Sequence, residues 1–505
     1  MKKINTILLL LWGFYQVFAQ QIPRSSPEAE GVSSAAIQKF IGSYQKDKHE
    51  LHSVMIIRHG KVIAEKWASP YAATLTHSMY SVSKSWTSTA IGFAVDEKRF
   101  TVEDKVLSFF PEYADLEANP FVKDLKIKDL LTMSVGHEKE PMRSVVVMQP
   151  DWVRGFLNAP IAYQPGTKFL YNTLATYMLS AIIQKATGQT VLDYLQTRLL
   201  KPLSIQGIDW EKDPKGINTG GWGIRVHTED MAKLGLLYLN KGKYEGKQIL
   251  SENWVHEATT KHIDQNPSAS QAKKDSSDWL QGYGYQFWRC RNGAFRADGA
   301  YGQYIVMLPA QDAVVVITSE SLDLQDDLNM IWEHLLPAFQ KEKLKANPKA
   351  VQALQKQSIA LSPAVSDTKK GDETWFGKTY TLSKNPFDFT QLQLERTGKQ
   401  ITLQIQTKDQ KTHRFGLSQE AWNMGETNLL GPYLLRSARV DLAQLGPFKT
   451  AASYYWQDAK HLGITLRYLQ SPHHWEMILS LEEGKLNLKI INSYEPKTEI
   501  NVTGM

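Results

Sequence analysis

The chain has 505 residues, which is long for one hydrophobic core, so we expect about two or three domains. Hydrophobic residues make up 42% and charged residues 22%, which is ordinary for a soluble globular protein. The formal net charge of +6 is small for this length, and no Lys/Arg block with interleaved aromatic residues occurs, which argues against a nucleic-acid partner.

Residues 1–19 predict a secretory signal peptide. Two lysines precede a short apolar run, and Ala19 follows as a small residue suited to cleavage. The run is short for a membrane-spanning helix, and no cysteine follows the cleavage site, so we expect neither an anchor nor lipidation there. The mature protein is therefore expected to be periplasmic or secreted, with no membrane span after signal removal.

The single cysteine of the chain is Cys290. An exported protein with one cysteine has no internal disulfide, so core packing has to stabilise it. No nearby His/Asn pattern of a cysteine hydrolase accompanies Cys290, and we interpret it as a structural thiol.

The first long region begins and ends with strand patterns. Residues 53–67 hold two apolar runs around His59-Gly60, which is typical of a β-hairpin. Residues 127–200 are mostly helical in pattern, with a Pro/Gly loop near residue 165. Strand-like runs follow at 283–290, 303–308 and 312–319, before a helix at 326–339. We therefore expect an α/β (α+β) fold, with one antiparallel sheet flanked by helices and a helical lobe.

The composition changes near residue 341. A polar helix and a linker occupy residues 346–372, and alternation takes over in residues 373–505. Ile401, Leu403 and Ile405 fall on one strand face, and residues 475–492 predict a hairpin that turns at Glu483-Gly484. We expect a first domain over residues 20–345 and a separate C-terminal all-β domain, sandwich or barrel.

Ser81 and Lys84 carry the first chemical signal. Their spacing places both on one helical face, with the serine near the helix start, where the dipole favours negative charge. A serine hydroxyl is a poor nucleophile until a base takes its proton. A lysine in a dry pocket can be that base, because burial disfavours its ammonium form. The small apolar residues that follow indicate a central, buried helix.

Two later stretches fit the same chemistry. Tyr171 lies at a loop-to-helix junction, where a tyrosine can shuttle a proton between nucleophile and leaving group, and the alternative is a packing aromatic like nearby Tyr177. A glycine-rich turn around Gly299 runs into a strand. Such a turn lets a substrate approach the backbone closely and offers an N–H to an oxyanion hole.

Four ordered segments carry a family resemblance: SVSK at 81–84, PGTKFLYN at 165–172, GINTGGWGIRVHTEDMAKLG at 216–235 and DGAYGQYIVMLPAQDAVVVITS at 298–319. With them, residues of about 25–340 resemble the β-lactamase-related serine hydrolases. This group includes class C β-lactamases, D-alanyl-D-alanine peptidases, family esterases and 6-aminohexanoate-dimer hydrolases. The resemblance implies a β-lactamase/transpeptidase-like fold with its site between sheet and lobe.

The same resemblance implies roles for individual residues. Ser81 would be the nucleophile, Lys84 the base and Tyr171 the proton shuttle. The backbone N–H groups of Ser81 and Ala300 would form the oxyanion hole. Supporting or substrate-binding positions would be Asn172, Thr173, Trp222, Gly299 and Tyr301.

The chain departs from the family pattern at two motifs. The usual Tyr-x-Asn reads Tyr171-Asn172-Thr173, which leaves open whether Asn172 or Thr173 faces Lys84. The third motif, normally Lys/His-x-Gly, reads Ala297-Asp298-Gly299, and the neighbouring Arg296 should point elsewhere on a strand. The missing cation favours an ester, a small amide or acyl transfer to an alcohol over β-lactams and peptidoglycan stems.

The sequence thus predicts an exported serine hydrolase that forms an acyl-enzyme on Ser81. Acyl transfer as the main activity, a β-lactamase or D-alanyl-D-alanine peptidase, and a non-catalytic binding protein are the alternatives. The expected partner is a small-molecule ester, amide or acyl donor. We expect no cofactor and no metal, because His256 and His262 are too far apart for a zincin pair and His473-His474 is a loop doublet expected to be solvated.

Overall fold

The computed structural model describes residues 21–44, 49–367, 371–398, 400–442 and 444–505. The predicted signal peptide, residues 1–19, lies outside the described residues. Within the described ranges, no helix combines the length and apolar character needed to cross a membrane.

The central sheet draws its strands from both ends of the first long region, as the sequence predicts. Its order is β2-β1-β11-β10-β9-β8, and the paired neighbours run antiparallel. The predicted hairpin at its edge is confirmed. The bounds are β1 His49–Arg58, β2 Lys61–Trp67, β8 Trp288–Arg289, β9 Phe295–Gly299, β10 Gln303–Leu308 and β11 Ala313–Ser321.

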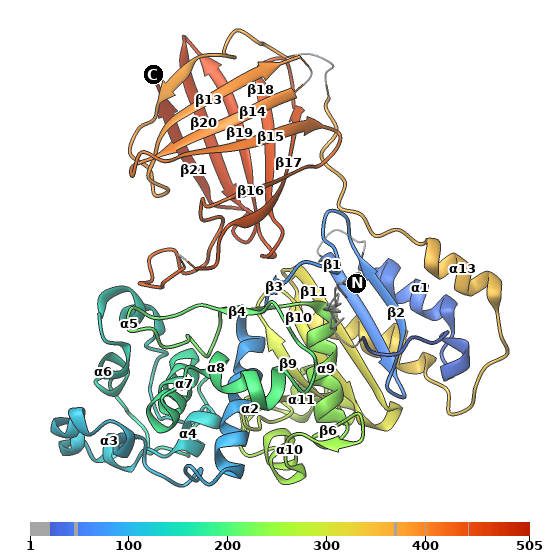
Figure 1. Ribbon diagram of the computed structural model, residues 1–505, viewed down its shortest axis with the longest axis vertical. Coiled ribbons are helices and arrows are strands. Elements are labelled where there is room, and N and C mark those ends of the chain that lie inside the picture. Colours follow the sequence, from blue (N-terminus) through green and yellow to red (C-terminus); the bar gives the residue numbers. More distant parts are fainter. Residues whose placement is uncertain (1–20, 45–48, 368–370, 399, 443) are drawn as a thin grey trace, which may run out of the picture.

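Helices cover both faces of this sheet (Figure 1). Alternate residues of a strand point to opposite faces, so Val314 and Val316 of β11 join one core while Val315 and Ile317 join another. α9 (Thr228–Leu239) packs on the first face, where a Cβ on Gly235 would lie 2.6 Å from Val314. α1 (Ser34–Ser43) and α12 (Leu324–Met330) supply residues to the core on the second face.

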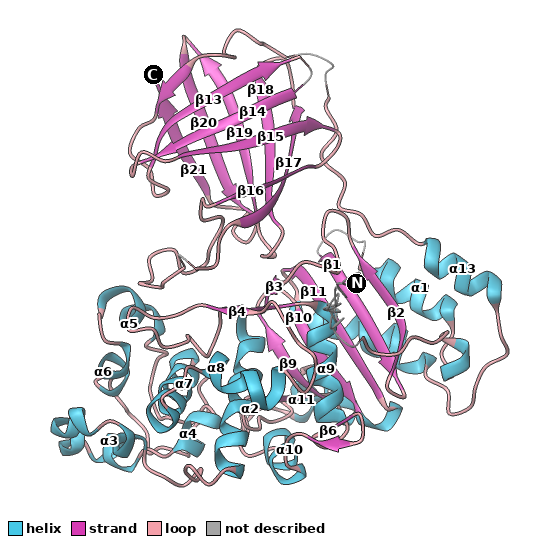
Figure 2. Cartoon of the chain, viewed as in Figure 1, coloured by secondary structure: helices cyan, strands magenta, loops and turns pink. Residues whose placement is uncertain are grey.

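The helical lobe lies beside the sheet, and α2 (Ser83–Asp96) is buried between them (Figures 1 and 2). All α2 residues from Ser83 to Ala94 are buried. The other helices of this region are α3 Pro120–Asp124, α4 Ile127–Leu131, α5 Met142–Met148, α6 Trp152–Leu157, α7 Thr173–Thr187, α8 Val191–Leu195, α10 Glu252–Thr259 and α11 Gln271–Ser276. Short strands complete it: β3 His77–Ser78, β4 Asp209–Trp210, β5 Ile224–Val226, β6 Lys243–Tyr244 and β7 Lys247–Gln248.

Helix α13 (Pro348–Lys356) belongs to the connection between the first region and the C-terminal sheet, and it packs against the first region. Leu354 is buried in the same core as Ile37 of α1, and the Gln357 side chain donates to the Gln38 carbonyl at 3.1 Å. This segment therefore packs against the N-terminal region before the chain reaches the all-β part.

The C-terminal part is a barrel. Its sheet has ten strands, and a bridge between Leu382 and Gly504 joins its first strand region to its last strand. Ile401, Leu403 and Ile405 are fully buried inside, as their alternation predicts. The strands are β12 Thr379–Thr381, β13 Phe389–Thr397, β14 Gln400–Thr407, β15 Thr412–Gln419, β16 Asn423–Thr427, β17 Phe448–Trp456, β18 His461–Tyr468, β19 His474–Glu482, β20 Lys485–Asn492 and β21 Glu499–Gly504.

Chain segments at one end of the barrel contact the N-terminal region (Figure 1). Between β16 and β17, Arg439 N–H donates to the Val146 carbonyl of α5 at 2.9 Å. Leu445 offers its carbonyl to Arg225 of β5 at 2.6 Å. Between β18 and β19, the Gln470 carbonyl accepts from Ser78 N–H at 3.0 Å. The barrel therefore touches the two elements, β3 and β5, that lead to and flank Ser81.

Candidate active site

Ser81 lies in a 3-10 turn, Tyr80–Val82, that leads directly into α2. The side chain of Ser83 fixes this turn. Its Oγ donates to the Tyr80 carbonyl at 2.6 Å and accepts from Ile224 N–H at 3.3 Å. The candidate nucleophile is thus held at the N-terminal end of a buried helix, where the helix dipole favours a developing negative charge.

The small hydroxyl residues of α2 tie the helix to the loops around it. Their side chains donate to backbone carbonyls of neighbouring segments: Ser85 to Gln286 at 2.8 Å, Thr87 to Gly220 at 2.9 Å and Ser88 to Tyr285 at 2.7 Å. Each bond satisfies a buried polar pair, which is why a central helix tolerates this composition.

Lys84 supplies a buried amine to the site. Only 1% of its surface is exposed, and its Nζ lies 2.9 Å from Ser81 Oγ and 2.7 Å from the Gly221 carbonyl oxygen. Burial lowers the pKa of the Lys84 ammonium to about 7, while the carboxylates of Glu140 and Asp298 oppose that shift. A substantial fraction of Lys84 is therefore a neutral amine at neutral pH, able to accept a proton.

Tyr171 lies next to this pair, just before α7. Its ring stacks on Trp288 with centroids 5.4 Å apart, and Lys84 Nζ is 4.9 Å from the ring centroid. Burial, reinforced by the Asp298 charge, raises the pKa of the Tyr171 phenol above its usual range, and a hydrogen bond with Ser81 opposes the rise. Tyr171 thus remains a neutral phenol beside the Ser81 hydroxyl.

The two residues that follow Tyr171 make different contacts. Asn172 caps α7, accepting from Ala175 N–H at 3.2 Å and contacting His137 with its amide nitrogen at 2.9 Å. Thr173 is the residue near the lysine, with Oγ1 3.5 Å from Lys84 Nζ. In this chain Thr173 occupies the place beside Lys84, and Asn172 is committed to the helix cap.

Strand β9 presents an ion pair rather than a lone cation. Arg296 and Asp298 share a strand face and are joined at 2.9 Å, whereas Ala297 points to the core on the opposite face. Arg296 points to the face opposite Ala297, as expected. Asp298 lies on the same face as Arg296, and its charge favours a higher pKa for both Lys84 and Tyr171. Burial raises the pKa of the Asp298 carboxyl, and Arg296 and Lys84 limit the rise.

Cys290 lies behind this ion pair. It is buried, and its Sγ accepts a hydrogen bond from Arg296 Nη1 at 3.1 Å. Burial raises the pKa of the thiol to about 11. A buried, protonated thiol is unreactive, in agreement with a structural role.

The turn after β9 is held close to the Ser81 turn. A Cβ on Gly299 would lie 2.4 Å from the Met79 carbonyl oxygen, so glycine is needed for this approach. Tyr301 has a left-handed φ of 62°, and its carbonyl accepts from Ser319 Oγ at 3.0 Å. The Ala300 carbonyl accepts from the Gln303 side chain at 3.2 Å, so the turn is firmly fixed.

Trp222 is buried between the lobe and the barrel. Its ring stacks on Trp152 with centroids 5.8 Å apart, and its Nε1 donates to Glu211 at 2.9 Å. Tyr433 of the barrel also donates to Glu211, at 2.5 Å. Burial raises the pKa of the Glu211 carboxyl to about 7, against these two hydrogen bonds. The contacts of Trp222 are those of a packing residue at the interface.

Sequence reasoning missed several groups at the site, and it misplaced one. The Gly221 carbonyl, Glu140 and Asp298 act on Lys84, and although Gly221 and Asp298 stood in quoted motifs, neither was assigned a role there, and Glu140 stood in none. The prediction that His473 is solvated is wrong, because the side chain is fully buried and its Nε2 lies 2.6 Å from the Tyr80 hydroxyl. Its burial depends on contacts across two regions, which a local sequence pattern does not report.

Comparison with known proteins assigns this arrangement to a family. The chain is 24% identical over 286 residues to the 6-aminohexanoate-dimer hydrolase of Paenarthrobacter ureafaciens, covering 52% of this chain and 70% of that protein. It is 24% identical over 239 residues to a provisionally named D-alanyl-D-alanine carboxypeptidase of Escherichia coli (strain K12), covering 41% of this chain. That alignment spans 55% of the Escherichia coli protein, little more than half its length.

A solved structure has the same fold. It is a provisionally named 6-aminohexanoate-dimer hydrolase from Bacillus anthracis, with a TM-score of 0.50 and 19% identity, covering 62% of this chain and 85% of that one. The family described as "Beta-lactamase" matches residues 38–338, more than half of the chain. This protein therefore belongs to the β-lactamase family.

Proposed function

We propose that this protein is an exported serine hydrolase that cleaves an ester or a small amide through an acyl-enzyme on Ser81. The observation that carries the proposal is the buried amine of Lys84, 2.9 Å from Ser81 Oγ, with its pKa lowered to about 7. A general base works best when its pKa lies near the operating pH and its atom is within hydrogen-bond reach of the proton.

The first half-reaction forms the acyl-enzyme. Neutral Lys84 accepts the Ser81 hydroxyl proton as Oγ attacks the substrate carbonyl carbon. The carbonyl oxygen becomes an oxyanion, which the N–H groups of Ser81 and Ala300 stabilise. When the intermediate collapses, Tyr171 gives its proton to the leaving alcohol or amine and takes one from the Lys84 ammonium.

The second half-reaction releases the acyl group. A water molecule enters in place of the leaving group, loses a proton to the Lys84–Tyr171 pair and attacks the acyl carbon. The proton then returns to Ser81 Oγ as the ester bond breaks. An alcohol in place of water would give acyl transfer by the same steps, so the acceptor decides between hydrolase and acyltransferase.

Labelling with a fluorophosphonate tests the nucleophile. The intact mass of the wild-type protein should rise by one phosphonyl group, and Ser81→Ala should take up none. Ser85→Ala is the matched control, since Ser85 lies on the same helix but donates to the Gln286 carbonyl, and it should label like the wild type. Equal labelling of wild type and Ser81→Ala would contradict the proposal.

Strand β9 offers no free cation to a substrate carboxylate at the position of the third motif. Ala297 stands where the family pattern has a cation for a substrate carboxylate, and Arg296 is neutralised by Asp298 at 2.9 Å. We therefore expect turnover of p-nitrophenyl esters at least tenfold above that of nitrocefin, measured as kcat/KM under one set of conditions. Nitrocefin turnover without ester turnover would favour a β-lactamase, and turnover of neither would favour a binding protein.

Export is supported by the signal-like pattern of residues 1–19 and by the resemblance to a carboxypeptidase-named relative. N-terminal sequencing of the protein from its natural host tests it. A mature chain that starts at Gln20 supports export, and one that retains residues 1–19 contradicts it.

A further inference from the structure

A barrel residue reaches the turn that carries Ser81. His473 lies between β18 and β19, and its side chain is fully buried. Its Nε2 lies 2.6 Å from the hydroxyl of Tyr80, the residue immediately before Ser81. The same barrel segment accepts a backbone hydrogen bond from Ser78 through the Gln470 carbonyl at 3.0 Å.

Glu320 anchors this histidine from the end of β11. Its Oε1 lies 2.6 Å from His473 Nδ1 and also accepts from Ser493 at 2.6 Å. Burial alone would raise the pKa of the Glu320 carboxyl, but the contacts with His473 and His474 outweigh it and hold that pKa at about 2. A carboxylate only accepts hydrogen bonds, so His473 Nδ1 donates to Glu320. In the neutral ring, Nε2 then accepts from the Tyr80 hydroxyl.

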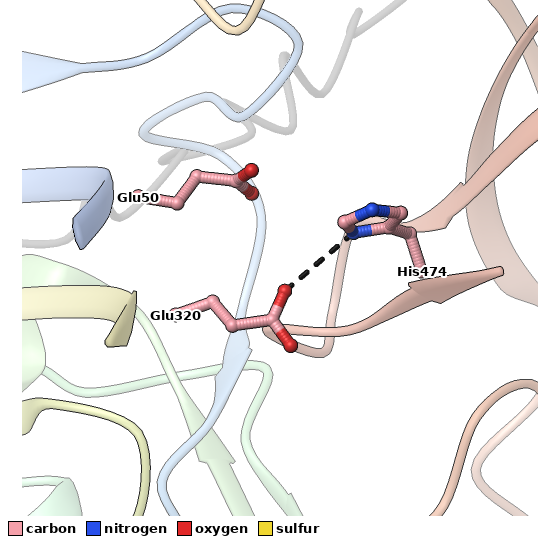
Figure 3. A group of neighbouring side chains, drawn as sticks. All are labelled: Glu50, Glu320 and His474. Atoms are coloured by element: carbon pink, nitrogen blue, oxygen red, sulfur yellow. Dashed lines mark ion pairs between the residues drawn. The ribbon is translucent and has the colours of Figure 1, made fainter. Parts of the chain in front are cut away.

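The surrounding charges belong to the interface rather than to a separate site. Glu50, Glu320 and His474 each have one atom of a type that can bind a metal ion, and these three atoms lie within 4.8 Å of one another (Figure 3). However, Glu50 is already engaged by Arg467 of the barrel through both of its carboxylate oxygens. Two ion pairs, Glu50 with Arg467 and Glu320 with His474, thus lie where barrel and sheet meet, and Glu320 holds His473 at the same place.

His473 also contacts the second half of the proposed oxyanion hole. Its ring meets the ring of Tyr301 edge-on, at 4.7 Å and 89°. Tyr301 follows Ala300, as Tyr80 precedes Ser81, so one histidine touches the residues that flank both N–H donors. Tyr80 and Tyr301 have left-handed φ angles of 45° and 62°. Such angles in bulky residues persist only where the surroundings hold them.

We propose that His473 is a positioning residue of the active site, supplied by the barrel. Resting on the proposed function, it holds Tyr80 by a hydrogen bond and Tyr301 by ring contact, and so fixes the direction of the Ser81 and Ala300 N–H groups. The two N–H groups of the oxyanion hole are aligned only when the barrel is docked, so the C-terminal part contributes to catalysis.

The test compares His473→Ala, His473→Gln and Tyr80→Phe in the full-length protein. Steady-state kinetics with a p-nitrophenyl ester give kcat and KM, and a boronic acid that adds to the nucleophilic serine probes the tetrahedral state. Loss of one oxyanion donor costs about 10²–10³-fold in kcat, and misalignment should cost less, roughly 10–100-fold in kcat for His473→Ala. We expect KM within about threefold of wild type, and boronate affinity to fall in parallel with kcat/KM.

The other variants separate positioning from general destabilisation. Tyr80→Phe keeps the ring and loses only the hydroxyl that contacts His473 Nε2. Because this leaves a buried acceptor unpaired, the variant should lose some thermal stability as well as activity, and kcat is compared at a temperature where every variant is fully folded. His473→Gln offers a polar atom near the Nε2 position and should recover part of the kcat lost in His473→Ala. His461→Ala is the control, because this barrel histidine is partly exposed and pairs with Asp458, and it should behave as wild type.

Any of three outcomes would overturn the inference while leaving the proposed function intact. The first is a kcat within about twofold of wild type in both His473→Ala and Tyr80→Phe. The second is a loss confined to KM, and the third is an unchanged boronate affinity in His473→Ala. Wild-type protein that takes up no fluorophosphonate at Ser81 would instead overturn the proposed function, and this inference with it.

Discussion

Replacement of Lys84 by methionine should lower kcat/KM for an ester by roughly 10²–10⁴-fold, the usual contribution of a general base. Methionine has a similar length and fills the buried space, but it cannot take the proton from Ser81, 2.9 Å away. It leaves the Gly221 carbonyl without its donor at 2.7 Å, which costs about 1–3 kcal/mol, but it also removes the cost of burying an amine that is fully protonated in the unfolded chain, so we expect no net loss in the free energy of unfolding at neutral pH.

The pH dependence of the wild type checks the same residue. Burial lowers the pKa of Lys84 to about 7, and only the neutral amine can act as a base. In a pH profile of kcat/KM, activity should therefore fall about tenfold per pH unit well below 7 and level off above it. Lys84→Met should lack this limb.

Lys233→Met is the matched control for Lys84→Met. Lys233 is also buried, its pKa is also lowered by burial, and its Nζ donates to the Ser204 carbonyl at 3.2 Å. It has no contact with Ser81 among those described, so its loss should leave kcat/KM within about threefold of wild type. Equal losses in the two variants would mean that Lys84 acts through stability alone.

Replacement of Tyr171 by phenylalanine should lower turnover of alkyl esters by roughly 10²–10⁴-fold. The ring would still stack on Trp288 at 5.4 Å, so the change removes only the hydroxyl beside Ser81. A p-nitrophenolate leaves without a proton, whereas an alkoxide needs one. The loss should therefore be smaller for p-nitrophenyl esters than for alkyl esters of the same acid, compared by kcat/KM.

Tyr283→Phe provides the control for this effect. Its ring lies edge-on to Tyr171 at 6.4 Å and belongs to the same aromatic group, so the variant disturbs similar packing. It should retain both activities within about threefold. A loss in Tyr171→Phe that is the same for both leaving groups would argue against proton delivery by Tyr171.

Much of the fold follows from local patterns in the sequence. The two apolar runs around His59-Gly60 can bury themselves only as a hairpin, and the β strands near residue 310 have the length and composition to pair with it. The spacing of Ser81 and Lys84 fixes their shared helical face, so the contact at 2.9 Å was foreseeable.

The choice between Asn172 and Thr173 could also have been made from local rules. Asparagine is a preferred N-cap residue, and Asn172 directly precedes α7, so its side chain is used by the cap. That leaves Thr173 as the residue near Lys84. The family pattern, rather than helix-capping chemistry, drew attention to Asn172.

The contacts between the two regions could not be predicted in this way. His473 and Glu320 are 153 positions apart, and Tyr80 lies 393 positions from His473. A histidine doublet in a polar loop has the same local pattern whether the loop is solvated or docked. Strand alternation likewise suits sandwich and barrel equally, and the bridge between Leu382 and Gly504 decides for the barrel.

Trapping the acyl-enzyme from an ester substrate shows which residue carries the acyl group. The protein is mixed with a p-nitrophenyl ester, quenched in acid within the first turnover and digested, and the peptide covering residues 67–84 is sequenced by tandem mass spectrometry. We predict the mass of the acyl group on Ser81, and none in Ser81→Ala. Ester turnover with no acyl group on Ser81 at any quench time, or with an adduct on another residue, would exclude Ser81 as the nucleophile.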